Sequence, residues 1–520
     1  MHKNIRQSMA WLHSWTGLLL GWLLFAIFIM GTASYYRHEI NLWMQPQLAQ
    51  HEVQQERSIK TAYQYLQQHA SDAKSWYIGV ASEQSPVTNI YWQKKEGGYE
   101  SKTLDANTGK ELNLSATLGG DFFYAFHYQL FGMPAMIGRV IVCLAAFIML
   151  IALISGIITH KKIFTDFFTL RTFKSQRSWL DFHNVSSVIA LPFFLMITFT
   201  GLAIFFYIYL PWGMKKLYPE DPFQFFKEIR TNVVEIQRPP QPMKNIGLET
   251  LLMKAKSQWG NQPIDSITAD KPNTNQARIT ITQEKDHSIT GNKPQITFDA
   301  TNGKVLSAIR NDSAIATLSF GVYGLHMANF AQPLLRLAFF FSGILGCLMI
   351  SSGLLLWSLK RQIQNKTHKF HFGHYLVDRL NVSTFVGLPI AMGSYLLANR
   401  LIKLEPNMPN YEVYTFFIVW LSTLVIAILT PKTWLWRSQL SMFIVLGIGL
   451  PCFNLAYLIQ YNFIHQISDY WTFFRVDLFF ILFAGFAYFI LKNIQPIQFK
   501  AKEKLEKKLN INKNVEVNAS

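Results

Sequence analysis

The sequence predicts an α-helical integral membrane protein with about eight transmembrane helices and two small α+β modules outside the membrane. Half of the 520 residues are hydrophobic, and only 15% are charged. Apolar runs of about 20 residues recur along the chain, and a run of this length can cross a bilayer as a helix. Two long polar stretches interrupt these runs, and each shows the pattern of a helix followed by strands. These three observations lead to the expected fold class.

The chain is basic, with a formal net charge of +17. Such a charge fits either nucleic acid or anionic lipid as a partner. The lysines and arginines, however, lie in short loops beside apolar runs and in the C-terminal tail, so a lipid bilayer accounts for them and nucleic acid is not expected. Cys143, Cys347 and Cys452 lie in apolar segments without a CxxC or CxxCH motif. They therefore indicate no disulfide framework, zinc site or covalent haem attachment.

The alternation of apolar and polar segments gives the expected topology. The first apolar run is long enough to span and lacks a small-residue cleavage site, so we expect an anchor rather than a removed signal peptide. The positive-inside rule places the basic loops and both termini on the cytoplasmic side. The expected segments are a first membrane helix (1–36), a polar module (37–130), a second helix (131–160), a basic loop (161–185), a third helix (186–210), a second polar module (211–325), a fourth helix (326–357), a basic loop (358–380), four additional helices (381–492) and a poorly ordered basic tail (493–520).

The two polar stretches are related to each other. Each begins with a helical pattern, at 59–70 and 248–260, and continues with strand-like runs. Each then reaches the motif Asp-Ala-x-x-Gly-Lys, within LDANTGK (104–110) and FDATNGK (298–304). Asp and Asn accept backbone hydrogen bonds and Gly takes the positive φ that other residues resist, so the motif predicts a hairpin-like turn. The stretches are expected to form two similar modules, each between two membrane helices.

The membrane helices around the modules also repeat. His13 precedes Gly31 by 18 residues, and His183 precedes Gly201 by the same interval. The second helix of each half opens from a segment with a histidine, a phenylalanine four residues later and a proline seven residues later. These segments are HYQLFGMP (127–134) and HMANFAQP (326–333). The first 360 residues are therefore expected to be a duplicated four-helix core, to which the last four helices add a scaffold.

Six of the fourteen histidines fall in two layers at the ends of the expected core helices. A single interfacial histidine is more often a solvated cap than a ligand, but the register between the repeats favours a common role. Imidazole is the ligand that a b-type haem iron needs from two helices at one depth, and no Met or Cys recurs at these places. We therefore expect two haems and an electron path across the membrane. The layers are His13, His160 and His183 on the inner side and His38, His127 and His326 on the outer side.

The repeat defines the pairing within each layer only in part. The symmetric pairs are His127 with His326 and His13 with His183. His38 and His160 break the symmetry, because the corresponding positions hold Ile208 and Trp357. Either of them could replace a symmetric partner, and the sequence leaves this open.

Other polar residues near the expected membrane ends have two interpretations. Arg139 and Arg336, just inside the second and fourth helices, are candidates to bind haem propionates. Snorkelling at the interface accounts for each of them equally well. In the second basic loop His368, His371 and His374 form a spaced trio. A solvated loop is the preferred interpretation of this trio over a metal site.

Three kinds of segment characterise about residues 1–365. They are the N-terminal helix WLHSWTGLLLGWLLFAIFIMGTASYYRHEI, the paired turns LDANTGK and FDATNGK, and the helix starts FHYQLFG and GLHMANF. Their order and duplication resemble the bacterial PepSY-associated transmembrane helix proteins, which include iron-regulated and iron-uptake membrane proteins. The resemblance implies a bacterial inner-membrane location, PepSY-like modules in the periplasm and two b-type haems in the core. Because members include di-haem reductases of ferric siderophores, it also implies a transmembrane ferric reductase, although the four additional helices depart from the shorter members.

The donor of electrons is expected to be a separate molecule. The chain has no GxGxxG motif and no recognisable flavin or nicotinamide domain, so a cytoplasmic reductase or a membrane quinol would have to supply electrons. The alternative function is a non-redox transport component, or a scaffold whose PepSY modules bind peptides or proteins. The scarcity of polar lining in the helices outside the histidine layers argues against this alternative.

Overall fold

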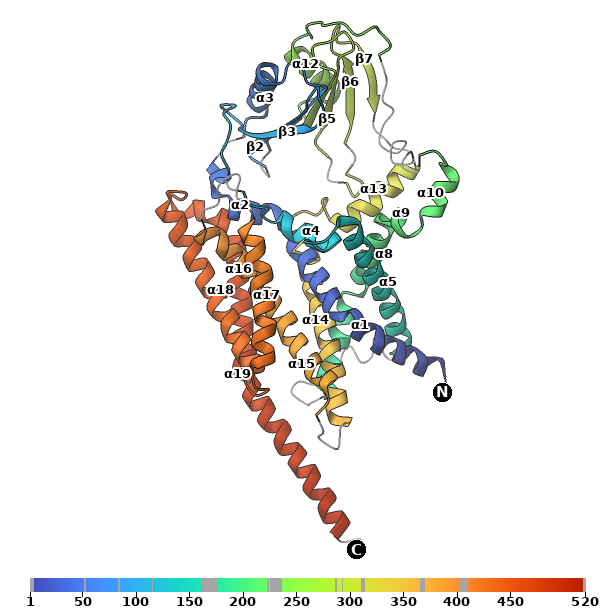
Figure 1. Cartoon of the computed structure of the whole chain (residues 1–520), viewed down its shortest axis with the longest axis vertical. Coiled ribbons are helices and arrows are strands. Elements are labelled where there is room, and N and C mark those ends of the chain that lie inside the picture. Colours follow the sequence, from blue (N-terminus) through green and yellow to red (C-terminus); the bar gives the residue numbers. More distant parts are fainter. Residues whose placement is uncertain are drawn as a thin grey trace.

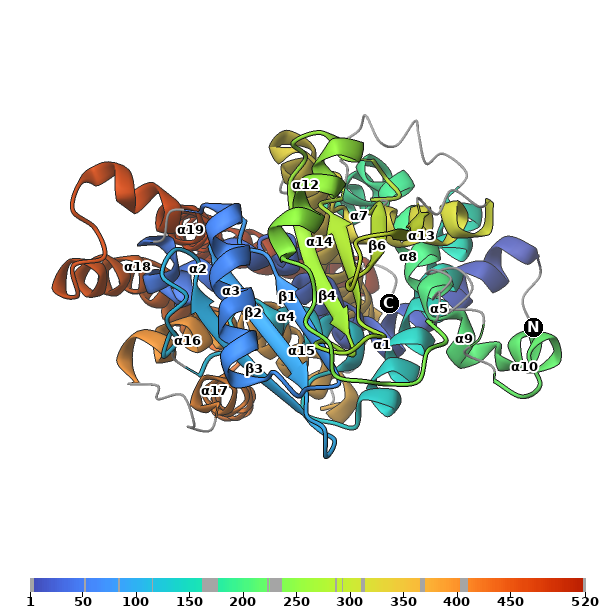
Figure 2. The ribbon, with the colours of Figure 1, turned by 90° about the horizontal axis from the view of Figure 1, so that it is seen from above.

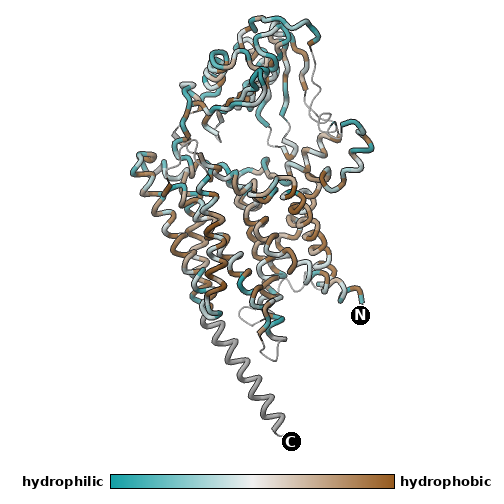
Figure 3. The backbone as a smooth tube through the Cα atoms, in the orientation of Figure 1, coloured by the Kyte–Doolittle hydropathy of each residue, from teal (hydrophilic) through white to brown (hydrophobic). Residues whose placement is uncertain are grey.

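A helical bundle carries a β-sheet at one end, and two helices lie on the outer face of that sheet (Figure 1). Hydrophobic residues predominate along the bundle, whereas the sheet end is largely polar (Figure 3). The computed structural model describes residues 4–50, 53–82, 85–114, 116–160, 176–221, 224, 236–285, 288–291, 293–309, 314–364, 370–402 and 410–517. Most of the first predicted basic loop, and His368 in the second, lie outside these described residues.

Seven helical spans in the described ranges are long and apolar enough to cross a membrane. An eighth is formed by α7 (Gln176–Ile189) and α8 (Leu191–Ile204), which meet at 64° and count as one bent span. The predicted fold class, a membrane protein of about eight spans, is confirmed. The seven spans are α1 (Ile5–Ser34), α5 (Ala135–Thr159), α14 (Pro333–Gln364), α15 (Phe372–Phe385) with α16 (Gly387–Leu401), α17 (Tyr411–Leu429), α18 (Leu435–Gln460) and α19 (Ile467–Val517).

Two of the eight spans differ from the prediction. The third span begins at Gln176 instead of residue 186, and it bends at Ala190, where Pro192 lies in the first turn of α8. Proline lacks a backbone N–H and fits the first turn of a helix, so a new helix starts there. The C-terminal tail was predicted to be poorly ordered, but α19 continues as a helix to Val517.

Short helices lie at the end of the bundle that faces the sheet (Figure 1). They are α2 (Arg37–Met44), the 3₁₀ helix η1 (Pro46–Gln50), α4 (Asp121–Gln129), α9 (Phe206–Tyr209), α10 (Pro211–Leu217) and α13 (Ala314–Met327). Two of them, α4 and α13, each connect the end of a module to the membrane helix that follows. They carry the histidines that were predicted to open those helices.

The strands of both modules join in one antiparallel sheet. Their order is β3-β2-β1-β4-β5-β6-β7, and β1 pairs with β4, so the modules meet edge to edge. The two repeated modules are present as predicted, but their union was not foreseen. The strands are β1 (Ser75–Gly79), β2 (Val87–Gln93), β3 (Tyr99–Asp105), β4 (Ile264–Asp270), β5 (Arg278–Gln283), β6 (Gln295–Asp299) and β7 (Val305–Ile309).

The sheet has one covered face and one face without helices. Helices α3 (Gln55–His69) and α12 (Leu248–Trp259) cover the face that points away from the bundle (Figures 1 and 2). Side chains alternate along each strand. In β1, Trp76 and Ile78 are therefore buried in the core beneath these helices, whereas Tyr77 is exposed on the other face. The helix-free face consequently points towards the membrane helices.

A row of hydroxyl groups crosses the helix-free face, with one residue from each strand. The strand registers place its members directly beside one another. The hydroxyl row consists of Ser101, Tyr91, Tyr77, Thr268, Thr280, Thr297 and Ser307. The rings of Tyr77 and Tyr91 are 5.7 Å apart, and the hydroxyls of Thr280 and Thr297 are 2.9 Å apart. This face is therefore polar and rich in groups that both donate and accept hydrogen bonds.

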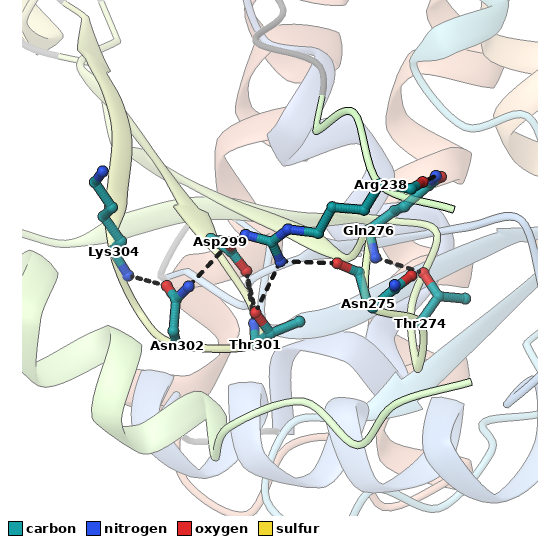
Figure 4. A network of polar contacts seen from close by, with 8 residues as sticks. All are labelled: Arg238, Thr274, Asn275, Gln276, Asp299, Thr301, Asn302 and Lys304. Atoms are coloured by element: carbon teal, nitrogen blue, oxygen red, sulfur yellow. Dashed lines mark hydrogen bonds and ion pairs between the residues drawn. The ribbon is translucent and has the colours of Figure 1, made fainter. Parts of the chain in front are cut away.

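The Asp-Ala-x-x-Gly-Lys motifs form the predicted turns. Gly109 and Gly303 have φ angles of +70° and +69°, which side chains with a Cβ resist. In the second turn the Asp299 carboxylate accepts hydrogen bonds from Thr301, Asn302 and the Arg238 guanidinium (Figure 4). Burial works to raise the pKa of Asp299, but the bonds from Thr301 and Arg238 outweigh it and lower the pKa.

Asp299→Ala is expected to destabilise the sheet by about 2–3 kcal/mol, because it removes hydrogen bonds to a buried carboxylate. Because the pKa of Asp299 is lower in the folded protein than in the unfolded chain, its ionised carboxylate stabilises the fold at a pH above the ordinary pKa of aspartate. This stabilisation is lost as the pH falls through the lowered pKa of the folded state. Thermal unfolding of the full chain in detergent at pH 7 and at pH 3 measures both effects. Asp270→Ala, at a half-exposed ion pair with Arg278, is the control and is expected to change stability by less than about 0.5 kcal/mol. Equal effects of the two changes would show that the hydrogen bonds to the Asp299 carboxylate do not stabilise the sheet.

A buried polar network ties the additional helices to the first module. The Arg400 guanidinium lies over the Trp43 ring at 3.9 Å and donates to Asn454 and to the Trp43 carbonyl. The indole of Trp43 donates to Asp477, 2.9 Å away. Buried charges are stable only when they are paired and hydrogen-bonded, and these groups satisfy one another. The added helices therefore hold α2, which connects α1 to the sheet.

Candidate functional site

Two pairs of histidines lie at opposite ends of the four-helix core. His127 on α4 and His326 on α13 form the sheet-side pair, with ring centroids 6.0 Å apart. His13 on α1 and His183 on α7 form the far-side pair, with ring centroids 6.2 Å apart. The carbonyl of Ile27, which contacts the sheet-side pair, is 14 residues from His13 on α1, or about 21 Å along the helix axis. The structure thus brings together the two symmetric pairs at two depths.

Each imidazole is held through Nδ1 by a neighbouring helix. In three of them Nδ1 lies within 2.8–2.9 Å of a main-chain carbonyl oxygen. The contacts are His127 to Ile27, His13 to Ala152 and His183 to Met349. A carbonyl only accepts hydrogen bonds, so Nδ1 carries the proton in each case. The lone pair of Nε2 is then available for a metal, and hydrogen bonds of this kind orient metal-binding histidines.

His326 reaches the same arrangement with help from a side chain. Its Nδ1 lies 3.0 Å from the hydroxyl of Thr200, and the imidazole also bonds the backbone of Ile197. The Thr200 hydroxyl donates its own proton to the Met196 carbonyl, 2.7 Å away. The hydroxyl therefore accepts from His326, so Nδ1 is again the protonated nitrogen and Nε2 carries the lone pair.

A glycine lies beneath each of the four imidazoles. A Cβ at Gly31 would come within 2.6 Å of His127 Nδ1, and a Cβ at Gly201 within 3.0 Å of His326 Cε1. Corresponding distances are 3.1 Å from Gly156 to His13 and 3.2 Å from Gly353 to His183. Each glycine follows the carbonyl that bonds the histidine by four residues, one turn along the same helix. The missing side chain lets the ring approach the helix backbone closely enough to bond that carbonyl.

Each half of the core positions its own imidazoles and supplies one to each pair. In the first half, α1 and α5 hold His127 and His13. In the second half, α8 and α14 hold His326 and His183. Both pairs therefore lie between the halves, and each ring is held in place independently of its partner.

The spacing of each pair fits two ligands of one metal ion. Two metal–imidazole bonds of about 2.0 Å place the ligand nitrogens about 4 Å apart and the ring centres about 6 Å apart. Within the parts of the chain that the structure describes, no three or more His, Cys, Asp or Glu are grouped so as to hold a metal ion. Two imidazoles alone suit a haem iron, because the porphyrin supplies its other four ligands.

The PepSY-associated TM region, a protein family, has a sequence model that matches residues 10–360. The match covers more than half of the chain and runs from α1 to the end of the core. The chain belongs to this family. The predicted family is thereby confirmed, and all four paired histidines lie within the PepSY-associated region. No curated protein matches the chain.

The four additional helices lie outside the PepSY-associated region. They begin with α15 and follow the last matched residue. None of the four paired histidines comes from them. Their polar network with Trp43 shows how they attach to the matched region.

The two histidines that break the repeat are placed differently. His38 is exposed on α2, near Arg37 and Asp121, and the structure pairs His127 with His326 instead. His160 ends α5 and lies within electrostatic range of His183. The ring packed against His183 is nevertheless that of His13.

The two predicted propionate partners also differ from each other. Arg336 forms an ion pair with Glu39 and lies over the Tyr36 ring at 4.8 Å, so the chain itself supplies its carboxylate. Arg139 donates to Gln129, but its buried Nε has no hydrogen-bond partner among the described residues. Arg139 therefore retains a donor for a ligand, whereas Arg336 is already occupied.

The residues that hold the histidines were mostly missed by the sequence analysis. Gly31 and Gly201 were noticed as part of the repeat, but no role was assigned to them. Gly156 and Gly353 were not noticed, although each follows a serine near the end of the second helix of its half. An alignment of the two halves around these Ser-Gly pairs would have found them.

Proposed function

We propose that this protein carries electrons across the membrane through two b-type haems, one at each histidine pair. The terminal acceptor is a ferric chelate, such as a ferric siderophore, on the side of the sheet. This makes the protein a transmembrane ferric reductase of iron uptake, with the sheet in the periplasm of a bacterial inner membrane. The basic loops and both termini then lie in the cytoplasm.

The observation that supports this proposal is the fourfold repetition of one arrangement. Each histidine is fixed through Nδ1, rests on a glycine and faces a second histidine at a ring separation of about 6 Å. A solvated or packing histidine needs none of these constraints. Partly buried imidazoles at the two ends of a core of membrane helices are costly, and such residues are functional candidates.

The residues of the chain would hold and tune the haems. The four imidazoles would bind iron through Nε2, and the Nδ1 hydrogen bonds would fix their orientation and raise their basicity as ligands. A bound haem takes up and releases one electron between Fe(III) and Fe(II). Arg139, with its unpartnered buried Nε, would bind a propionate by a charge-assisted hydrogen bond.

The hydroxyl row suits the proposed substrate. Ferric chelates present many oxygen atoms, and the hydroxyls of the helix-free face can donate to and accept from them. Tyr77 and Tyr91 add flat surfaces against which such a ligand can pack. This face points towards the bundle end that holds the sheet-side pair (Figure 1). Reduction of Fe(III) to Fe(II) lowers the charge of the bound iron, so the hard oxygen ligands of the chelate bind it less tightly.

The full chain, purified in detergent, is expected to contain two haems and to give the reduced-minus-oxidised spectrum of b-type haem with two imidazole ligands. A pyridine haemochrome assay gives the number of haems per chain. Circular dichroism shows whether a preparation without haem is folded. A folded chain that remains colourless after haem is supplied would overturn the proposal and favour a non-redox transport or scaffold role.

A further inference from the structure

A cleft opens beside the far-side pair, at the end of the bundle away from the sheet. It has a volume of about 570 Å³ and lies between α1, α14 and the start of α15. This volume is within the range of small-molecule sites. Trp15 and Trp357, whose rings are 6.5 Å apart, form part of its wall. Trp357 follows Gly353, which lies against the His183 ring, by one turn on the same face of α14, so this wall of the cleft lies beside the far-side pair.

Polar groups from two helices line this otherwise apolar cleft. His371 and His374 lie at the start of α15 with ring centroids 5.2 Å apart, and the His374 ring packs edge-on against Trp357 at 6.2 Å. The Arg361 guanidinium lies 5.5 Å from the centre of the Trp357 ring. The indole Nε1 of Trp357 is buried and has no hydrogen-bond partner among the described residues. The site thus offers donors and basic nitrogens to a ligand of mixed polarity.

The remaining wall of the cleft is apolar and accessible. Phe372 and Leu376 on α15 line it and are exposed, and Trp15 is 43% exposed. In a bilayer this surface lies against lipid or the headgroup layer. A ligand with a polar head and an apolar tail can therefore enter from the membrane and place only its head near His374.

We propose that this cleft binds a membrane quinol and that the quinol is the electron donor of the protein. This inference rests on the proposed function. The quinol hydroxyls would bond to His371 and His374, and Trp357 Nε1–H would donate to a quinone oxygen. Oxidation of one quinol to the quinone releases two electrons and two protons. The oxidant would be the two ferric haems that the histidine pairs would hold, each accepting one of these electrons. The protons pass to the two imidazoles and then to water.

The chemistry of the cleft favours a quinol over a flavin or nicotinamide nucleotide. Nucleotides carry phosphates, which proteins bind with several cations or with the backbone of a glycine-rich turn at a helix start. This cleft has one arginine, and Gly373 alone does not make such a turn. Its aromatic and aliphatic walls match a quinone ring and an isoprenoid tail.

The test uses the full chain with haem and decylubiquinone as the probe. Isothermal titration calorimetry is expected to show that His374→Ala and Trp357→Phe each bind decylubiquinone at least tenfold more weakly than the wild type. Trp357→Phe keeps an aromatic ring but removes the N–H. His465→Ala, an exposed histidine remote from the cleft, is the matched control and is expected to bind as the wild type does. In stopped-flow experiments decylubiquinol is expected to reduce the wild type and the control at least tenfold faster than the two variants. Dithionite is expected to reduce all four proteins fully.

The outcomes separate this inference from the proposed function. Equal binding of decylubiquinone and equal rates of reduction by decylubiquinol in all four proteins would overturn the cleft assignment. A protein that a soluble flavin reductase reduces and decylubiquinol does not reduce would overturn it too. In both cases the haem count and the dithionite spectrum would leave the two-haem proposal intact. A chain that binds decylubiquinone at the cleft but contains no haem would support the binding site and refute electron transfer through haem.

Discussion

Replacing both sheet-side histidines, as His127→Ala with His326→Ala, is expected to lower the haem content from two per chain to one. The two imidazoles supply all the protein ligands that we assign to that haem, and alanine supplies none. The far-side pair is held by other carbonyls and glycines, so its haem is expected to remain. Reduction of a ferric chelate is expected to fall to the uncatalysed rate, because the path to the sheet side is interrupted.

Haem content and the difference spectrum of the purified double variant measure this effect. His38→Ala is the control, because His38 is the outer-layer histidine that the structure leaves outside the pair. This control is expected to keep both haems and full activity. If the double variant kept two haems, or if His38→Ala lost one, the assignment of the sheet-side pair would be wrong.

Gly31→Ala is expected to have the next largest effect, although it adds a single methyl group. That methyl would lie 2.6 Å from His127 Nδ1, well inside contact distance. The ring would have to retreat and lose its 2.8 Å bond to the Ile27 carbonyl, a loss of about 1 kcal/mol. Displacement of Nε2 from the iron position would add to this loss. We expect haem affinity at the sheet-side pair to fall by about tenfold or more, since 1.4 kcal/mol corresponds to a factor of ten.

The affinity can be measured by haem transfer to an excess of apomyoglobin. Gly17→Ala is a matched control on the same helix, because no atom lies within 4 Å of the Cβ position at Gly17. Gly353→Ala should have a smaller effect than Gly31→Ala, since its Cβ would lie 3.2 Å from the nearest atom of His183. Equal haem transfer from Gly31→Ala and Gly17→Ala would show that the glycines do not support the rings.

Much of the architecture could be predicted because it is encoded locally. Apolar length gives the membrane spans, and the turn motif gives the positive φ angles at Gly109 and Gly303. The repeat goes further, because equivalent positions in two similar halves meet across the interface between them. This is why the symmetric pairs of histidines could be named before the helices were placed. Whether the pairs bind haem stays a prediction.

The contacts that hold the histidines depend on the packing of helices and could not be predicted in this way. His183 bonds a carbonyl 166 residues away, and no local pattern indicates which helix will lie beside it. The same holds for Arg336, whose partner Glu39 is 297 residues away. The pairing of β1 with β4 was missed because each module alone has an acceptable set of strands.

The edge-to-edge sheet and the shared histidine pairs have a consequence for the origin of the protein. Two equivalent strands pair antiparallel at the centre of the sheet, and each half gives one ligand to each pair. These are the properties of an isologous interface, in which the same surface of two identical subunits meets across a twofold axis. A gene for one half of the core could therefore have encoded a homodimer with both sites complete from the start. Fusion of its two copies would then have freed each half to diverge, so that one came to hold a histidine with a threonine hydroxyl and the other did not.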